Sequence, residues 1–106
     1  SYLTKNYNRK KISFKKGKGS YLYTDNGIKY LDMVSGIAVN SLGHANPKLI
    51  KTLIKQSKKV WHVSNSFLIP EGEELAKKLV KKTFADFVMF QSSGTEATEA
   101  AAPAAE

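Results

Sequence analysis

Residues 87–101, FVMFQSSGTEATEAA, decide the fold of this chain, because an apolar run, a polar turn and a helix start follow one another here. The unbroken apolar run Phe87–Phe90 is typical of a strand buried on both faces of a sheet. Ser93 and Glu96 have the S-x-x-E spacing of a capping box, in which hydroxyl and carboxylate each satisfy a backbone N–H at the helix start. The stretch therefore predicts a buried strand that runs through a tight turn into a helix.

The turn before this helix is suited to an anion. The first N–H groups of a helix have no partner within it, and the helix dipole adds a partial positive charge at the same end. Gly94 has no Cβ, so a bulky anion such as phosphate can approach the backbone closely. We interpret the turn as a candidate phosphate site, with a capped helix that binds nothing as the alternative.

Composition indicates a globular chain and excludes several kinds of site. The 106 residues are 42% hydrophobic and include no cysteine, which excludes disulfides and thiolate metal sites. His44 and His62 are the only histidines, and with no ligand pair at metal spacing we expect hydrogen-bonding residues and no metal. Because no apolar run has the length of a membrane span and the N-terminus lacks a signal-peptide core, we expect a soluble, cytoplasmic protein without a membrane partner.

The net charge of +8 raises the possibility of an acidic partner such as nucleic acid. Most of the lysines, however, fit solvent-facing sides of helices. The cluster from Lys5 to Lys18 is the exception, and it lacks the signatures of an RNA-recognition sheet or a helix-turn-helix. We expect no nucleic-acid partner, and a basic polyanion-binding module remains an alternative.

The segment from Ile12 to Asp32 predicts a small antiparallel meander. Turns are expected at Lys16–Gly19 and at Asp25–Gly27, with the strands Tyr21–Tyr23 and Ile28–Leu31 on either side of the second turn. The tyrosines of these strands are expected to pack across the sheet. The segment Met33–Leu42 fits neither the helical nor the strand period, and we expect it to be buried and irregular.

Two helices are predicted downstream of the meander. Asn46 as N-cap and Pro47 at the first helical position begin one of them, and Pro70 begins the other. Pro103 should stop or kink the helix that begins at Gly94 after fewer than three turns. Because one strand and a short helix cannot complete an α/β sheet, we expect the chain to be the front part of a larger fold.

Three stretches together resemble the class-III aminotransferases, which depend on pyridoxal 5′-phosphate and have fold type I. They are GKGSYLYTDNGIKYLDMVSGIAVNSLGHANPKLI at 17–50, WHVSNSFLIPEGEELAKKLV at 61–80 and FADFVMFQSSGTEATEAA at 84–101. Ordered motifs at matching separations are far more specific than a lone glycine pattern. Within the family, SGIAVNSLGH is most similar to the members that act on N-acetylornithine, while the ornithine, succinyldiaminopimelate and 4-aminobutyrate transaminases share much of the rest.

The resemblance implies an α/β fold of which this chain is the N-terminal part. Residues 1–70 would form the N-terminal small-domain segment, with the meander and the first helix. Residues 71–106 would form the incomplete start of the large domain that binds pyridoxal phosphate. The resemblance also implies a homodimer in the full-length enzyme, and transfer of an amino group from an amino-acid substrate to 2-oxoglutarate in arginine biosynthesis.

The resemblance assigns residues to the site. Ser93, Gly94 and Thr95 match the turn that holds the cofactor phosphate. Ile37 and Val39 match the segment that borders the substrate side of the cofactor, and Asn65 matches a region near the dimer interface and the mouth of the site.

The sequence also departs from the family pattern. Ser92 and Thr98 each stand where the family commonly has asparagine, and residues 101–106 read AAPAAE where the family continues a long helix. The lysine that forms a Schiff base with the cofactor, the acid at its pyridine nitrogen and the arginine for the substrate carboxylate all have no counterpart here. We therefore expect no catalytic residue in this chain and no transamination by it alone, and a non-catalytic remnant of the fold is a further alternative.

Overall fold

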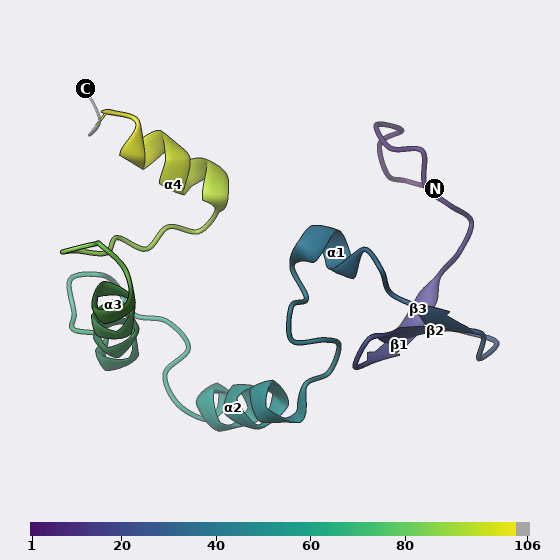
Figure 1. Ribbon diagram of the computed structural model, residues 1–106, viewed down its shortest axis with the longest axis horizontal. Coiled ribbons are helices and arrows are strands. Elements are labelled where there is room, and N and C mark those ends of the chain that lie inside the picture. Colours follow the sequence, from purple (N-terminus) through teal and green to yellow (C-terminus); the bar gives the residue numbers. More distant parts are fainter. Residues whose placement is uncertain (104–106) are drawn as a thin grey trace. The chain divides into compact units, whose positions relative to one another are not determined.

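The computed structural model describes residues 1–103, and the chain divides into two compact units, residues 1–61 and 62–106. Figure 1 labels the helices and strands. The first unit contains three strands and two helices: β1 (Phe14–Lys18), β2 (Tyr21–Thr24), β3 (Lys29–Leu31), α1 (Ser35–Ala38) and α2 (Pro47–Ser57). The described part of the second unit, residues 62–103, contains two helices: α3 (Pro70–Lys82) and α4 (Gly94–Ala101). The predicted domains 1–70 and 71–106 concern the complete fold and stay a prediction.

The predicted meander forms a three-stranded antiparallel sheet in the order β1-β2-β3. The expected turn at Lys16–Gly19 is wrong, because Lys16–Lys18 belong to β1 and Lys18 pairs with Tyr21. Only Gly19 and Ser20 are left to connect the strands, and Gly19 has a φ of +57°. Two-residue hairpin loops use such positive φ values because they match the twist of the strands.

The second turn of the meander is confirmed at Asp25–Gly27. The N–H of Gly27 donates to the carbonyl of Thr24, and the N–H of Thr24 donates to the carbonyl of Ile28, both at 3.0 Å. On the sheet, the rings of Phe14 and Tyr30 meet edge to face with centroids 5.6 Å apart. This contact between β1 and β3 confirms cross-strand packing for Tyr30.

Helices α2 and α3 begin where their sequence signals predict. The Oδ1 of Asn46 accepts hydrogen bonds from the N–H groups of Lys48 and Leu49 at 3.0 and 3.4 Å, and Pro47 is the first residue of α2. Helix α3 begins at Pro70, with acidic residues in its first turn and lysines in its last. Both charge positions complement the helix dipole.

Residues 87–90 do not form the predicted strand. A strand requires a neighbour for its backbone hydrogen bonds, and within residues 1–103 the only sheet is the meander. The predicted burial is also absent, because Phe87 is 92% exposed. An apolar run indicates the burial that a complete sheet would give, and the described residues supply no second strand beside this one.

Burial is low throughout the described chain. None of residues 1–103 is buried, so the expected burial of Met33–Leu42 is wrong, although its irregular backbone is confirmed. Helix α4 ends at Ala101, two residues before Pro103, as predicted, and residues 104–106 of the AAPAAE stretch lie outside the described residues. No helix among the described residues has the length and apolar character needed to cross a membrane.

Candidate functional site

The start of α4 carries the predicted phosphate turn. Ser93 is its N-cap in an extended backbone conformation, and its Oγ accepts a hydrogen bond from the N–H of Glu96 at 3.2 Å. The expected second half of the capping box is wrong. The Glu96 carboxylate accepts from the Ser93 hydroxyl at 3.2 Å instead of from a backbone N–H. Because the serine hydroxyl can donate and accept at once, it takes both partners.

This arrangement leaves backbone donors free for a ligand. Among the described residues, the N–H groups of Ser93, Gly94 and Thr95 have no hydrogen-bond partner. Apart from its chain neighbours and the backbone of its own helix, no described atom lies within 4 Å of the point where a Cβ on Gly94 would stand, so the turn is open on that side. Adjacent N–H groups at a helix start with an open approach fit an anionic group such as phosphate.

Thr98 stabilises the same turn through a hydrogen bond within the helix. Its Oγ1 donates a hydrogen bond to the carbonyl of Gly94 at 2.9 Å. Thr98 therefore supports the first turn of α4. Helix α4 is eight residues long, which is enough to orient its N–H groups along one axis.

A second polar site lies in the first unit, around an unusual turn. All four residues of α1 have positive φ, at 55° for Ser35, 64° for Gly36, 63° for Ile37 and 61° for Ala38. The segment is thus a left-handed turn and not a right-handed helix. A non-glycine residue in this conformation costs roughly 1–2 kcal/mol, and a β-branched residue such as Ile37 is rare there.

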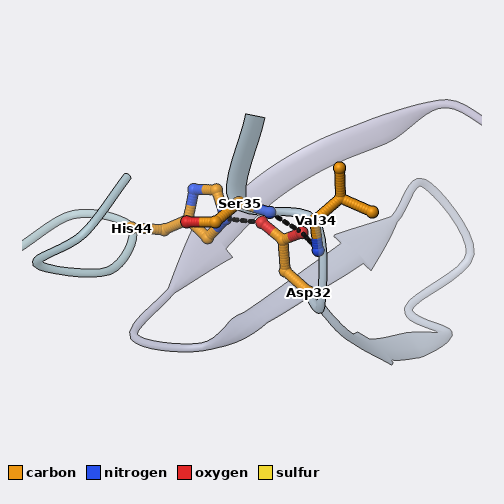
Figure 2. A network of polar contacts seen from close by, with 4 residues as sticks. All are labelled: Asp32, Val34, Ser35 and His44. Carbon is orange, nitrogen blue, oxygen red and sulfur yellow. Dashed lines mark hydrogen bonds and ion pairs between the residues drawn. The ribbon is translucent and has the colours of Figure 1, made fainter. Parts of the chain in front are cut away.

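Asp32 holds the beginning of this turn (Figure 2). Its Oδ1 accepts hydrogen bonds from the N–H groups of Ser35 at 2.8 Å and Val34 at 3.2 Å. Its Oδ2 lies 2.6 Å from Nε2 of His44. The two side chains are only 10% and 20% exposed, Asp32 being the lower. The Ser35 N–H, followed by the hydrogen bond from His44, holds the pKa of Asp32 below its ordinary value of 3.8.

His44 is itself fixed to the sheet. Its backbone exchanges two hydrogen bonds with Gly19, at 2.9 and 2.8 Å. Its ring packs so closely on Gly17 that a Cβ there would stand 2.6 Å from the ring. A polar cavity of about 180 Å³ adjoins the pair, lined by residues that include Ser20, Asp32 and His44. This confirms His44 as a hydrogen-bonding residue in a loop.

The other predicted site residues fall in both units. Ile37 and Val39, predicted to border the substrate, lie in and directly after the left-handed turn and are 86% and 75% exposed. Asn65 lies in a turn of the second unit that is closed by a 3.0 Å hydrogen bond from the Phe67 N–H to the Ser64 carbonyl. Their contacts with a substrate stay a prediction.

Sequence reasoning missed Asp32 and Ser35 and gave His44 no specific partner. One local signal was present, because an aspartate often accepts hydrogen bonds from N–H groups two and three residues ahead. That spacing matches Val34 and Ser35. The partnership with His44, twelve residues away across an irregular loop, has no signature in the sequence.

Comparison with known proteins finds close relatives. The family described as "Aminotransferase class-III" matches residues 2–106. The acetylornithine aminotransferase of Rhodobacter capsulatus is 57% identical over 95 residues, which cover 90% of this chain and 24% of that protein. The acetylornithine aminotransferase of Aquifex aeolicus is 54% identical over 102 residues, which cover 95% of this chain and 27% of that protein.

Solved structures share the fold. The N-acetylornithine aminotransferase of Stenotrophomonas maltophilia K279a superimposes with a TM-score of 0.83 at 36% identity, over 90% of this chain and 26% of that one. The ornithine delta-aminotransferase of Plasmodium falciparum superimposes with a TM-score of 0.89 at 27% identity, over 96% of this chain and 27% of that one. The predicted fold class is confirmed, and the chain spans about a quarter of the length of the relatives it matches.

Proposed function

Since this chain belongs to the class-III aminotransferase family, we propose that it is the N-terminal part of an enzyme that transfers an amino group from N-acetylornithine to 2-oxoglutarate. The observation that carries the proposal is the 57% identity to an acetylornithine aminotransferase over 90% of the chain. Such an enzyme would serve arginine biosynthesis in the cytoplasm as a homodimer. The Schiff-base lysine would lie outside this chain, which would therefore not transaminate by itself.

We infer that the cofactor is pyridoxal 5′-phosphate, on which the class-III aminotransferase family depends. We infer that the phosphate is held at the start of α4 by the N–H groups of Gly94 and Thr95, together with Ser93. The free donors and the open side of Gly94 support this inference. When bound, the cofactor supplies the electron sink that amino-group transfer requires.

The residues at this turn would act by binding and orienting. The Ser93 hydroxyl holds Glu96, which keeps the first turn of α4 in place. The partial positive charge of the helix start then complements a phosphate. These residues would take no proton from the substrate, and their contribution is to fix the position of the cofactor.

Ile37 and Val39 of the first unit are proposed as substrate-side residues, and Asn65 of the second unit is proposed separately from its own family position. Apolar side chains such as Ile37 and Val39 would border the aliphatic part of an amino-acid substrate and exclude water from it. The Asn65 amide can donate and accept hydrogen bonds, so it suits a polar group of the substrate. Their family positions and the exposure of Ile37 and Val39 support this assignment.

The test uses the full-length polypeptide that carries these residues. With 2-oxoglutarate as acceptor, we expect kcat/KM for N-acetylornithine to exceed that for ornithine, succinyldiaminopimelate and 4-aminobutyrate by about tenfold or more. The isolated 106-residue chain serves as the inactive control. A preference for ornithine would overturn the proposed substrate and favour the ornithine aminotransferase alternative, which the structural similarity to the P. falciparum enzyme supports.

A further inference from the structure

The left-handed turn requires stabilising contacts from residues outside it. Three of its four residues, Ser35, Ile37 and Ala38, are not glycine and have positive φ values. Such conformations persist only where the surrounding structure fixes them, and they concentrate at functional sites. The hydrogen bonds that fix this turn lie at the two ends of the loop formed by residues 33–43.

Both ends of the 33–43 loop are attached to the same hairpin turn. Before the loop, the N–H of Asp32 donates to the carbonyl of Ser20 at 2.8 Å. After it, His44 exchanges two backbone hydrogen bonds with Gly19. The loop therefore leaves and re-enters the sheet at neighbouring residues. Loops whose ends lie close together in this way are frequently functional.

The side chains of Asp32 and His44 join the two ends. One carboxylate oxygen of Asp32 is used by the backbone of the turn, and the other is used by His44, as Figure 2 shows. Because a carboxylate only accepts, Nε2 of His44 is the donor in this bond. Inside the loop, the carbonyl of Ser35 accepts from Val39 and Asn40 at 2.9 and 3.0 Å, which closes the turn.

We propose that Asp32 and His44 are positioning residues that close the 33–43 loop, hold Ser35–Ala38 in its left-handed turn and thereby fix where Ile37 and Val39 stand. Under the proposed function these two side chains border the amino-acid substrate, and that last step rests on the proposed function. The proposal that Asp32 and His44 stabilise the turn rests only on hydrogen bonds within the first unit.

Substitutions at Asp32 and His44 can distinguish the hydrogen bonds to the turn from the hydrogen bond between the two side chains. An Asp32→Asn variant keeps an acceptor for the N–H groups of Val34 and Ser35, but its amide has one oxygen and cannot also accept from His44 without releasing the turn. A His44→Gln variant keeps a donor that can reach a carboxylate. A His44→Ala variant removes the donor. If this bond positions the loop, His44→Gln should keep part of the loop stability that His44→Ala loses.

The experiment measures hydrogen exchange of residues 33–43 in the full-length holoenzyme. We expect Asp32→Asn and His44→Ala to speed exchange of the loop about tenfold, with His44→Gln in between and β2 unchanged. Glu74→Gln is the matched control, because it breaks an ion pair with Lys78 on α3 whose side chains are 66–67% exposed. Unchanged exchange in both Asp32→Asn and His44→Ala would overturn the proposal.

A second variant tests the strain directly. Glycine adopts the left-handed conformation freely, so an Ala38→Gly variant needs less hold. In that background the effect of Asp32→Asn on loop exchange should shrink, and the cycle of single and double variants measures the coupling. Equal effects in both backgrounds would show that the pair does not hold the turn, which would contradict the proposal.

Kinetics separate this proposal from the proposed function. With N-acetylornithine as donor, we expect Asp32→Asn to raise KM about tenfold and to change kcat less, as for lost substrate positioning. An enzyme that does not use N-acetylornithine, with the exchange results as expected, would overturn the proposed substrate and support the hold on the turn. Normal kinetics in a variant with fast loop exchange would overturn the link to the substrate.

Discussion

A substitution at Gly94 is expected to change cofactor affinity without changing the stability of the protein. We expect a Gly94→Ala variant to keep the stability of the full-length protein, because its Cβ would meet no atom within 4 Å in this chain and alanine favours the helix. We expect its affinity for pyridoxal phosphate to fall about tenfold, because the methyl group occupies the side from which an anion approaches. Absorbance titration with the cofactor and a thermal melt measure the two quantities.

The control for this prediction is Gly72 in α3. A Cβ at Gly72 would lie 3.7 Å from the nearest atom of Ile69, an ordinary contact. A Gly72→Ala variant should therefore stabilise its helix by about 0.5–1 kcal/mol and leave cofactor affinity unchanged. Equal cofactor affinities in Gly94→Ala and the unaltered protein would exclude Gly94 from the phosphate site.

The Asp32 carboxylate predicts a dependence on acid. Its pKa in the folded state is lower than its ordinary 3.8, first because of the Ser35 N–H and then because of His44. A lowered pKa means that the stabilisation is present above pH 3.8 and is lost as the pH falls through the folded pKa. Protection of the 33–43 loop from hydrogen exchange, corrected for the intrinsic rate, should therefore hold at neutral pH and decline below about pH 4.

The Asp32→Asn variant is the control for the pH profile. It cannot titrate, so its loop protection should be low at neutral pH and should not show the decline in this window. In the structure, Nε2 of His44 lies 2.6 Å from the Asp32 carboxylate. Loop protection that stays constant to pH 2 in the unaltered protein would contradict the assignment to Asp32.

Residue-level predictions from the sequence succeed where the partners are close along the chain. The bond between Ser93 and the N–H of Glu96 spans three residues, and the S-x-x-E spacing predicts it. The choice of the Glu96 carboxylate between the Ser93 hydroxyl and a backbone N–H depends on side-chain rotamers, which the spacing does not contain. The Asp32–His44 pair depends on the return of a whole loop to the sheet.

At the scale of elements, the left-handed turn predicts different changes in stability for substitutions at positions 36 and 38. We expect Gly36→Ala to destabilise the full-length protein by about 1–2 kcal/mol, because it adds a Cβ at a φ of +64°. We expect Ala38→Gly to be nearly neutral, because relief of the strained conformation is offset by the greater entropy of glycine in the unfolded chain. Urea unfolding monitored by circular dichroism measures both.

Equal destabilisation by these two substitutions would contradict a left-handed turn in the folded protein. An alanine Cβ at position 36 would also lie 3.3 Å from the Asn40 amide nitrogen. Because a larger side chain would add to this steric contact, Gly36→Ser is a poor substitute for Gly36→Ala in this test. The Asn40 side chain is flexible, and its displacement alone should cost less than the backbone strain.

Elements with local start signals were predicted well. Helices α2 and α3 begin at Pro47 and Pro70 because proline fixes the first helical φ, and this needs no tertiary contact. The hand of α1 could not be predicted, since the hydrogen bonds that hold it come from Asp32 and from the loop closure. The run 87–90 was predicted as a strand from its apolar character, but strand formation depends on a neighbour that the described residues do not contain.

At the scale of the whole molecule, the chain has the fold of the N-terminal part of class-III aminotransferases, and its described residues form no core. None of residues 1–103 is buried, and the apolar faces of its elements stand open, with Leu53 of α2 70% exposed and Trp61 87% exposed. Since the chain covers 24–27% of its relatives, the proposed enzyme would supply the remaining surfaces against which such faces pack. Burial of these apolar faces is therefore expected only in the complete fold.

This lack of burial predicts that the isolated 106-residue chain does not fold cooperatively. Ordering the backbone costs about 1–2 kcal/mol per residue, and burial of apolar surface is the main term that offsets it. We expect the isolated chain to show no sharp thermal transition and no near-ultraviolet circular dichroism, whereas the full-length protein should melt cooperatively. Mixing the chain with the separately expressed remainder of the polypeptide should restore both signals. A cooperative melt of the chain alone would contradict the prediction, because it would require a core that none of the described residues forms.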